Sequence, residues 1–257
     1  MSETVGTTHR ILAALRLLAA TKGTLSVKDV SQSLALPMST SHRMLDMLME
    51  AGFVEKDTAR RRYGIGMEFF RIANLVAQNP VVAATLQPAL DELTRRTGES
   101  SVLSIYLPAD HAMTFVAKSD SPDSLRFEID LFGQRQLVWG ATGLAILAFL
   151  PKTVQDAAFD KAVPSPVSGK VLSRKEFDAR IAKARRDGVA VTENENLSDS
   201  VGIAAPLTGG PDRVIGSVAL TIPRYRYDRT KAALYAELLI RAATGLAGKG
   251  ALLRTAL

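Results

Sequence analysis

The sequence has little of what several kinds of functional site require. Its 257 residues include no cysteine, one tryptophan and three histidines. Without cysteine the chain forms no disulfide, no thiolate nucleophile and no cysteine-ligated zinc site. A membrane helix needs about 20 apolar residues, whereas the apolar run at residues 11–20 is short and contains Arg16. We therefore expect a soluble, cytoplasmic protein that has no membrane partner.

Length and charge point to two folded domains and permit an anionic partner. Lysine and arginine total 32 against 26 acidic residues, a formal charge of +6 that fits nucleic acid without proving it. Hydrophobic residues make up 47% and charged residues 23%, which disfavours a disordered or coiled-coil chain. Because 257 residues exceed one typical core of about 100 to 150 residues, we expect two domains.

The first third has the pattern of a winged helix-turn-helix. Apolar spacing predicts helices at residues 8–20, 27–34 and 37–50. Ser26 is the expected N-cap of the second helix, and Pro37 suits the first position of the third. Strands are expected at 53–56 and 62–65, joined as a hairpin.

Two polar clusters in this third are candidate DNA contacts. The start of the third helix, the end that meets base edges in a major groove, offers Ser39, Thr40, His42 and Arg43. The hairpin tip offers phosphate-binding side chains, Arg60, Arg61 and Arg62, followed by Tyr63. The alternatives are helix capping for Ser39 and a solvated turn for the arginines.

Several motifs together resemble the IclR family of bacterial transcription regulators. They lie at residues 25–30, 36–45 and 62–66, and further along at 133, 140–148, 185–191 and 203–207. The resemblance implies an α+β protein with a winged helix-turn-helix DNA-binding domain (1–66), a connector helix (67–80) and a GAF-like α/β effector-binding and oligomerisation domain (81–257). We expect a homodimer or dimer of dimers on a palindromic double-stranded operator, with no cofactor. We expect its effector to be a small organic carboxylate with an aromatic or branched body.

The pattern of the remaining two thirds predicts a sheet flanked by helices. We expect helices at 67–77, 85–96, 141–150, 174–187 and 229–246, and strands at 101–107, 112–118, 125–131, 189–193, 200–207 and 214–222. The helix at 67–77 is apolar all round, which favours burial against another chain. The alternative is a core helix of the first domain.

A glycine-rich turn is the candidate effector site. Trp139, Gly140, Ala141, Thr142 and Gly143 open a predicted helix, where free N–H groups can receive a carboxylate and Trp139 can cover an apolar body. The alternative is a tight turn with Trp139 in the core. The resemblance adds further lining residues, namely Thr192, Gly202, Ala204, Ser217 and Ala219.

Some positions depart from the family pattern or leave alternatives open. The family usually has an apolar residue where Ser41 stands, and many members have an acidic residue and a cysteine where Thr192 and Gly202 stand. Four arginines are candidate anion ligands or dimer contacts, with solvation as the alternative: Arg126, Arg224, Arg226 and Arg229.

The alternative function is an enzyme or small-molecule-binding protein in which the winged helix mediates only interaction. No familiar catalytic motif supports it, and the large domain contains one histidine, His111. We therefore predict no catalytic residue and no metal site, and expect a DNA-binding regulator.

Overall fold

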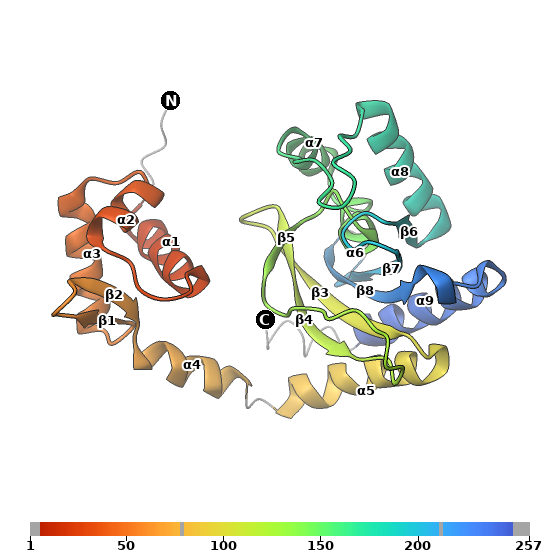
Figure 1. Cartoon of the computed structure of the whole chain (residues 1–257), viewed down its shortest axis with the longest axis horizontal. Coiled ribbons are helices and arrows are strands. Elements are labelled where there is room, and N and C mark those ends of the chain that lie inside the picture. The colour runs from red at the N-terminus through yellow and green to blue at the C-terminus, as the bar shows by residue number, and fades with distance from the viewer. Residues whose placement is uncertain (1–5, 78–79, 211–212, 249–257) are drawn as a thin grey trace. The chain divides into compact units, whose positions relative to one another are not determined.

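The chain folds into two compact units, Met1–Asn79 and Pro80–Leu257. The computed structural model describes residues 6–77, 80–210 and 213–248 (Figure 1). Over these ranges, no helix is both long and apolar enough to cross a membrane.

The first unit contains three helices followed by a hairpin (Figure 1). The helices are α1 (Thr7–Ala20), α2 (Val27–Ser33) and α3 (Met38–Glu50). Strands β1 (Val54–Asp57) and β2 (Arg62–Ile65) pair in antiparallel fashion. The predicted winged helix-turn-helix is confirmed, with element ends within a residue or two of those expected.

Local signals in the sequence explain how these helices begin. Ser26 caps α2 in a capping box, in which its hydroxyl accepts from the Asp29 N–H while the Asp29 carboxylate accepts from the Ser26 N–H. Pro37 is the N-cap of α3 and not its first helical residue. Ser41, on the inner face of α3, is 0% exposed, and its hydroxyl has no hydrogen-bond partner in the described structure.

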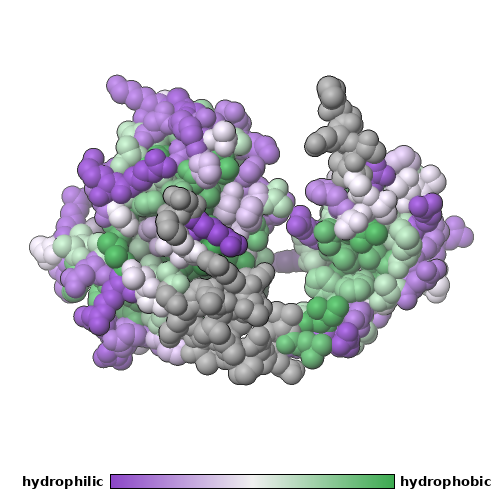
Figure 2. Space-filling model, turned by 180° about the vertical axis from the view of Figure 1, so that it is seen from behind, coloured by the Kyte–Doolittle hydropathy of each residue, from purple (hydrophilic) through white to green (hydrophobic). Residues whose placement is uncertain are grey.

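Helix α4 (Met67–Ala77) follows the hairpin as predicted. Four of its large apolar side chains are exposed, namely Met67, Phe70, Ile72 and Leu75. Figure 2 shows hydrophobic side chains gathered over this helix. The alternative of a core helix of the first unit is therefore wrong, because the core of that unit is complete without these side chains.

The second unit is one antiparallel sheet of six strands in the order β5-β4-β3-β8-β7-β6. The strands are β3 (Ser100–Leu107), β4 (Ala112–Ser119), β5 (Gln134–Gln136), β6 (Ala190–Glu193), β7 (Ser200–Thr208) and β8 (Val214–Pro223). Neighbouring strands of the sheet are consecutive along the chain except at the β3–β8 contact, which joins the two halves of the sheet at its centre.

Helices cover both faces of this sheet and form two separate cores (Figure 1). Helices α5 (Pro80–Thr97) and α9 (Ala232–Gly248) pack on one face. The other face carries α6 (Ala141–Leu147), α7 (Lys152–Asp160) and α8 (Arg174–Asp187). Two short 3₁₀ turns, η1 (Arg224–Arg226) and η2 (Arg229–Lys231), precede α9.

Several expected elements differ from the structure. Residues 125–131 form no strand, because β5 pairs with β4 instead and the polar–apolar alternation buries only Ile129 well. Helix α7 was not predicted. Helix α5 begins at Pro80 and contains Pro88, so it starts five residues before the predicted helix, and the expected break at residues 78–79 lies outside the described residues.

Candidate DNA interface and effector pocket

The predicted DNA-contacting residues of α3 lie on its outer surface. Ser39, His42 and Arg43 are exposed and Thr40 is half-buried, whereas the opposite side of the helix enters the core. The imidazole Nδ1 of His42 lies 2.8 Å from the carboxylate of Asp46, one turn further along. The first two turns of α3 therefore present hydroxyl, imidazole and guanidinium groups together.

The structure adds Arg10 to this surface. Arg10 of α1 lines one groove with Ser39, Thr40 and Arg43 of α3. Its Nε is buried and has no hydrogen-bond partner among the described residues. Two arginines and two hydroxyls in one groove form an arrangement suited to a phosphate. Helical periodicity predicted only that Arg10 lies off the apolar face of α1. It did not indicate that Arg10 lies beside α3.

The three arginines at the wing tip have different surroundings. Arg60 is 81% exposed, and its guanidinium lies 3.9 Å from Asp57. Arg61 is exposed and adopts a left-handed backbone conformation, with φ of 50°. Arg62 turns back and donates from Nε to the hydroxyl of Thr24 at 3.0 Å, with Asp29 at 3.6 Å. Arg60 and Arg61 are thus available to DNA, and Arg62 holds the hairpin to the residues before α2.

Tyr63 is a correction to the predicted interface. Its side chain is 1% exposed and belongs to the core, because Tyr63 lies on the inner face of β2. Its backbone N–H and carbonyl pair with those of Leu25 at 2.7 and 2.8 Å, and the Lys56 ammonium lies over its ring. Tyr63 therefore stabilises the wing and its side chain does not face the outside.

The second unit has a pocket at the start of α6. Of the residues predicted to line an effector site, it contains Gly140, Ala141, Thr142, Thr192 and Gly202. These residues come from the turn into α6 and from strands β6 and β7, where Thr192 and Gly202 are directly paired. The predicted juxtaposition of the glycine-rich turn with Thr192 and Gly202 is thus present.

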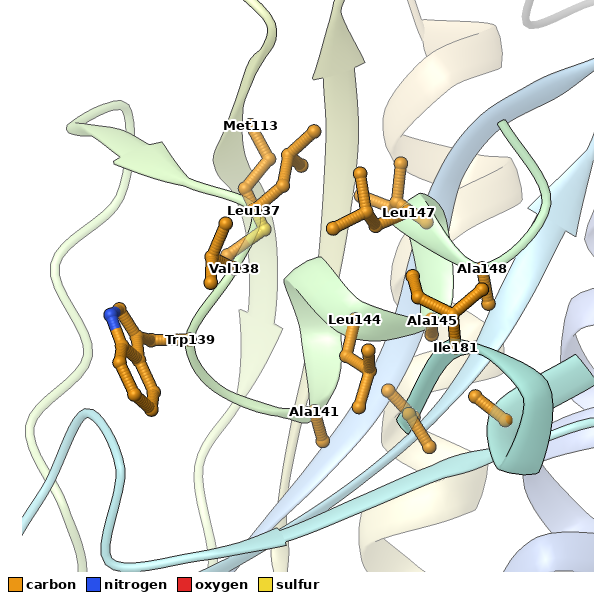
Figure 3. Packing of buried hydrophobic residues seen from close by; sticks show 14 of the residues in the cluster. Met113, Leu137, Val138, Trp139, Ala141, Leu144, Ala145, Leu147, Ala148 and Ile181 are labelled. Atoms are coloured by element: carbon orange, nitrogen blue, oxygen red, sulfur yellow. The ribbon is translucent and has the colours of Figure 1, made fainter. Parts of the chain in front are cut away.

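Trp139 is a second correction, because it lies in the core. It is 2% exposed, its Nε1 donates to the Val163 carbonyl at 2.7 Å, and the Arg180 guanidinium lies over its ring. Figure 3 shows the ring pointing away from α6. The alternative of a tight turn with a buried tryptophan is the one that the structure supports.

Four other expected lining residues are also packed away from the pocket. Ala204 and Ala219 are buried in the sheet core. Ser217 donates to the Thr142 carbonyl at 3.0 Å from beneath α6. Gly143 is required for packing, since a Cβ there would lie 2.4 Å from the Leu137 carbonyl oxygen.

One of the backbone amides predicted to receive a ligand carboxylate is already occupied. The N–H of Gly140 donates to the Glu195 carboxylate at 2.8 Å. The same carboxylate accepts from Arg180 at 2.6 and 2.7 Å, and both side chains are 19% exposed. The positive end of the helix therefore interacts with an acid of the protein itself.

Sequence reasoning missed nine of the lining residues, which are Phe115, Glu128, Ile129, Arg135, Glu195, Asn196, Leu197, Ser200 and Thr221. Three of them belong to the β6–β7 connection, whose tight turns place Asn194 and Asp199 at φ of 54° and 52°. The run of Asn, Asp and Glu there is a turn signal that could have indicated a pocket rim. Nothing in the sequence indicated Phe115 or Arg135.

The four additional arginines have mostly structural surroundings. Arg226 is bonded through Nε and Nη2 to the buried Glu99 at 3.1 and 2.6 Å. Arg224 and Arg229 both lie within 3.6 Å of Glu193. Arg126 is exposed and lies on the segment that forms no strand. Over the described ranges, no group of three or more histidine, aspartate and glutamate side chains could hold a metal ion.

Comparison with known proteins assigns both units. Residues 6–58 match the IclR helix-turn-helix domain, and residues 74–247 match the bacterial transcriptional regulator IclR C-terminal domain. The glycerol operon regulatory protein of Streptomyces coelicolor is 28% identical over 228 residues, which cover 86% of each chain.

Solved structures share the fold. An IclR transcriptional regulator from Silicibacter sp. TM1040 superposes with a TM-score of 0.83 at 24% identity, covering 95% of this chain and 96% of that one. An IclR homologue from Microbacterium hydrocarbonoxydans, complexed with 4-hydroxybenzoate, gives 0.70 at 20% identity, covering 96% and 98%. With both domain models matched in order along one chain, the protein belongs to the IclR family of bacterial transcriptional regulators.

Proposed function

We propose that this regulator binds operator DNA through α3 and the wing, and that a small organic carboxylate controls the binding. The observation that carries the proposal is the grouping of Arg43, Arg60 and Arg61 as exposed cations on one compact unit. A helix of this kind reads base edges from its N-terminal half, and a basic hairpin binds the phosphate backbone.

The α3 residues divide by chemistry into base-reading and phosphate-binding groups. The guanidinium of Arg43 can bond guanine with two parallel hydrogen bonds, which gives sequence selectivity. Arg10, Ser39 and Thr40 line the same groove and suit phosphate oxygens, which fix the register of the helix without selecting sequence. His42 lies beside Arg43 and is held by Asp46, so its ring has a fixed orientation for a base or sugar contact.

The dimer that we propose forms through α4. Its exposed Met67, Phe70 and Leu75 would cost free energy in water, and a second copy of the helix would cover them. A two-fold dimer, or a dimer of such dimers, presents two recognition helices and therefore fits a palindromic operator. A regulator of this kind acts in the cytoplasm, where its DNA is.

The effector that we propose occupies the pocket at the start of α6. Phe115, Ile129 and Leu197 supply apolar surface, and Arg135 supplies a positive charge. The structural relative that holds 4-hydroxybenzoate supports an aromatic acid as one member of this class. A ligand that binds one conformation of the dimer better than the other changes the spacing of its DNA-binding units, and α4 is the segment through which that change would pass.

Binding to genomic fragments tests the regulator proposal. The full-length protein is titrated against sheared DNA from the genome that encodes it, at moderate salt, and the retained fragments are sequenced. We expect a small set of fragments that share a palindrome and bind at least a thousandfold more tightly than bulk DNA, the lower end of about 10³ to 10⁷ for specific binding. Absent binding, or equal affinity for all fragments, would contradict the proposal that the protein binds a specific operator.

A further inference from the structure

Arg135 is the one cation among the residues that line the effector pocket in the described structure. We propose that it, and not the start of α6, binds the carboxylate of the effector, and that the effector is a monocarboxylate with a flat apolar body. This inference rests on the proposed function and identifies the charged contact within that site.

The position of Arg135 is set by the edge of the sheet. Arg135 pairs with Met113 across β5 and β4, and Phe115 lies two residues along β4 on the same face. The guanidinium carbon lies 5.1 Å from the centre of the Phe115 ring. An aromatic face fixes the plane of a guanidinium while leaving its edge N–H groups free for a planar acceptor such as a carboxylate.

Arg135 also has unused hydrogen-bonding capacity. Its Nε is buried and has no hydrogen-bond partner among the described residues. No carboxylate of the described chain lies within ion-pair distance of it, although Glu128 lines the same pocket. Most other buried or half-buried arginines of this unit are paired, as Arg180 and Arg226 are. A buried donor without a partner is unfavourable, so an incoming carboxylate gains a hydrogen bond that the free protein lacks.

The competing anion site, at the start of α6, already holds a carboxylate of the chain itself. Glu195 already accepts from Gly140 and from Arg180. A ligand carboxylate placed at that amide would lie against a like charge, which raises its free energy. Asn196 packs closely against the same turn, because a Cβ on Gly140 would lie 2.3 Å from the Asn196 amide nitrogen. The α6 turn therefore shapes the pocket while the ligand's charge is bound at β5.

The rest of the lining indicates how the ligand body is held. Ile129 and Leu197 give apolar contact, as Phe115 does beside the charge. Thr192, Ser200 and Thr221 supply hydroxyl groups on the β6, β7 and β8 side of the pocket. A body with a carboxylate at one end and a polar group at the other matches this distribution, because each end meets hydrogen-bonding groups and the middle meets apolar side chains.

A panel of acids and their amides tests the assignment. Wild-type protein, R135Q, R135K and R96Q are screened by thermal shift and calorimetry against benzoate, 4-hydroxybenzoate, phenylacetate and hexanoate, each beside its primary amide. R96Q removes an exposed arginine outside the pocket with the same loss of charge. Unfolding temperatures without ligand show whether each variant is folded.

We expect wild type and R96Q to bind at least one acid more tightly than its amide. R135Q should lose about tenfold or more in affinity for that acid, the effect of losing a charge-assisted hydrogen bond, while its affinity for the amide stays within about twofold. R135K keeps the positive charge but lacks the planar guanidinium, so its affinity for the acid should lie between those of wild type and R135Q.

The experiment distinguishes failure of the Arg135 assignment from failure of the proposed effector class. If R135Q and R135K bind the acid as wild type does, Arg135 is not the carboxylate site and the proposed effector class stands. If no acid of the panel raises the unfolding temperature of wild type, the carboxylate class itself is wrong, and the assignment of Arg135 falls with it.

Discussion

The carboxylate of Glu195 joins the backbone amide of Gly140 to the guanidinium of Arg180. E195A should lower the free energy of unfolding of the second unit by about 1–3 kcal/mol, because it leaves a mostly buried guanidinium and an amide without their acceptor. E128A removes an exposed glutamate from the same pocket and should change stability by less than about 0.5 kcal/mol. Denaturant unfolding measures both, and an equal effect of the two variants would show that the Glu195 contacts contribute nothing.

Ser41 buries a hydroxyl on the inner face of α3 without a hydrogen-bond partner in the described structure. S41A removes this unsatisfied group and replaces it with a better helix former, so the first unit should gain about 1 kcal/mol. S39A, on the exposed side of the same helix, is the matched control and should gain less. A loss of stability in S41A, measured by thermal unfolding, would mean that the hydroxyl has a partner.

Arg43 should decide sequence selectivity. R43A is expected to lose about 1–3 kcal/mol of discrimination between operator and an operator altered at one guanine, while affinity for unrelated DNA changes much less. Fluorescence anisotropy with the two duplexes measures the ratio. K22Q removes an exposed cation outside the α3 groove and should keep the wild-type ratio. A normal ratio in R43A would remove Arg43 from base recognition.

The wing arginines should act on all DNA alike. Because Arg60 and Arg61 extend outward, R60Q/R61Q should reduce the slope of log affinity against log salt by about 0.9 for each phosphate that the variant no longer neutralises. R62Q should leave the slope nearer that of wild type and lower thermal stability, since this side chain bonds to Thr24. Equal slopes in wild type and R60Q/R61Q would exclude the wing from phosphate binding.

Filling the pocket should separate effector response from DNA binding. Leu197 lines the pocket and is half-exposed, so L197W adds bulk at the rim without opening the core. Operator affinity should stay within about twofold, since the DNA-binding unit is untouched, while the effector's influence on it disappears. V171W, at an exposed position outside the pocket, is the control. A normal effector response in L197W would place the ligand elsewhere.

The sequence was a good guide where a local signal decides the structure. Ser26 marks the start of a helix through its capping box, as expected, and does so in the structure. Residues 125–131 show the limit, because their polar–apolar alternation is that of a strand while the β4 edge is taken by β5. Strand pairing is a competition between segments that no single segment encodes.

In the candidate sites, too, features set by local sequence were predicted and features set by contacts between distant segments were not. Exposure of Ser39, His42 and Arg43 followed from the helical period. The pocket required contacts between residues far apart in the chain, such as Arg135 with Phe115 and Glu195 with Gly140. Trp139 and Tyr63 were misjudged for one reason: an aromatic residue with a polar atom suits a binding surface and a core equally well, and its partners decide which.

The bonds of Arg62 to Thr24 and of Tyr63 to Leu25 tie the wing to the segment that leads into α2. The wing and α3 also share one core within one compact unit, so we expect their mutual geometry to stay constant. On the proposed operator, the bases contacted within one half-site should then be the same whether or not an effector is bound. In the proposed dimer, an effector would instead alter the distance between half-sites that the two DNA-binding units tolerate. Operators that differ only in the length of their central spacer should therefore differ most in their response to it.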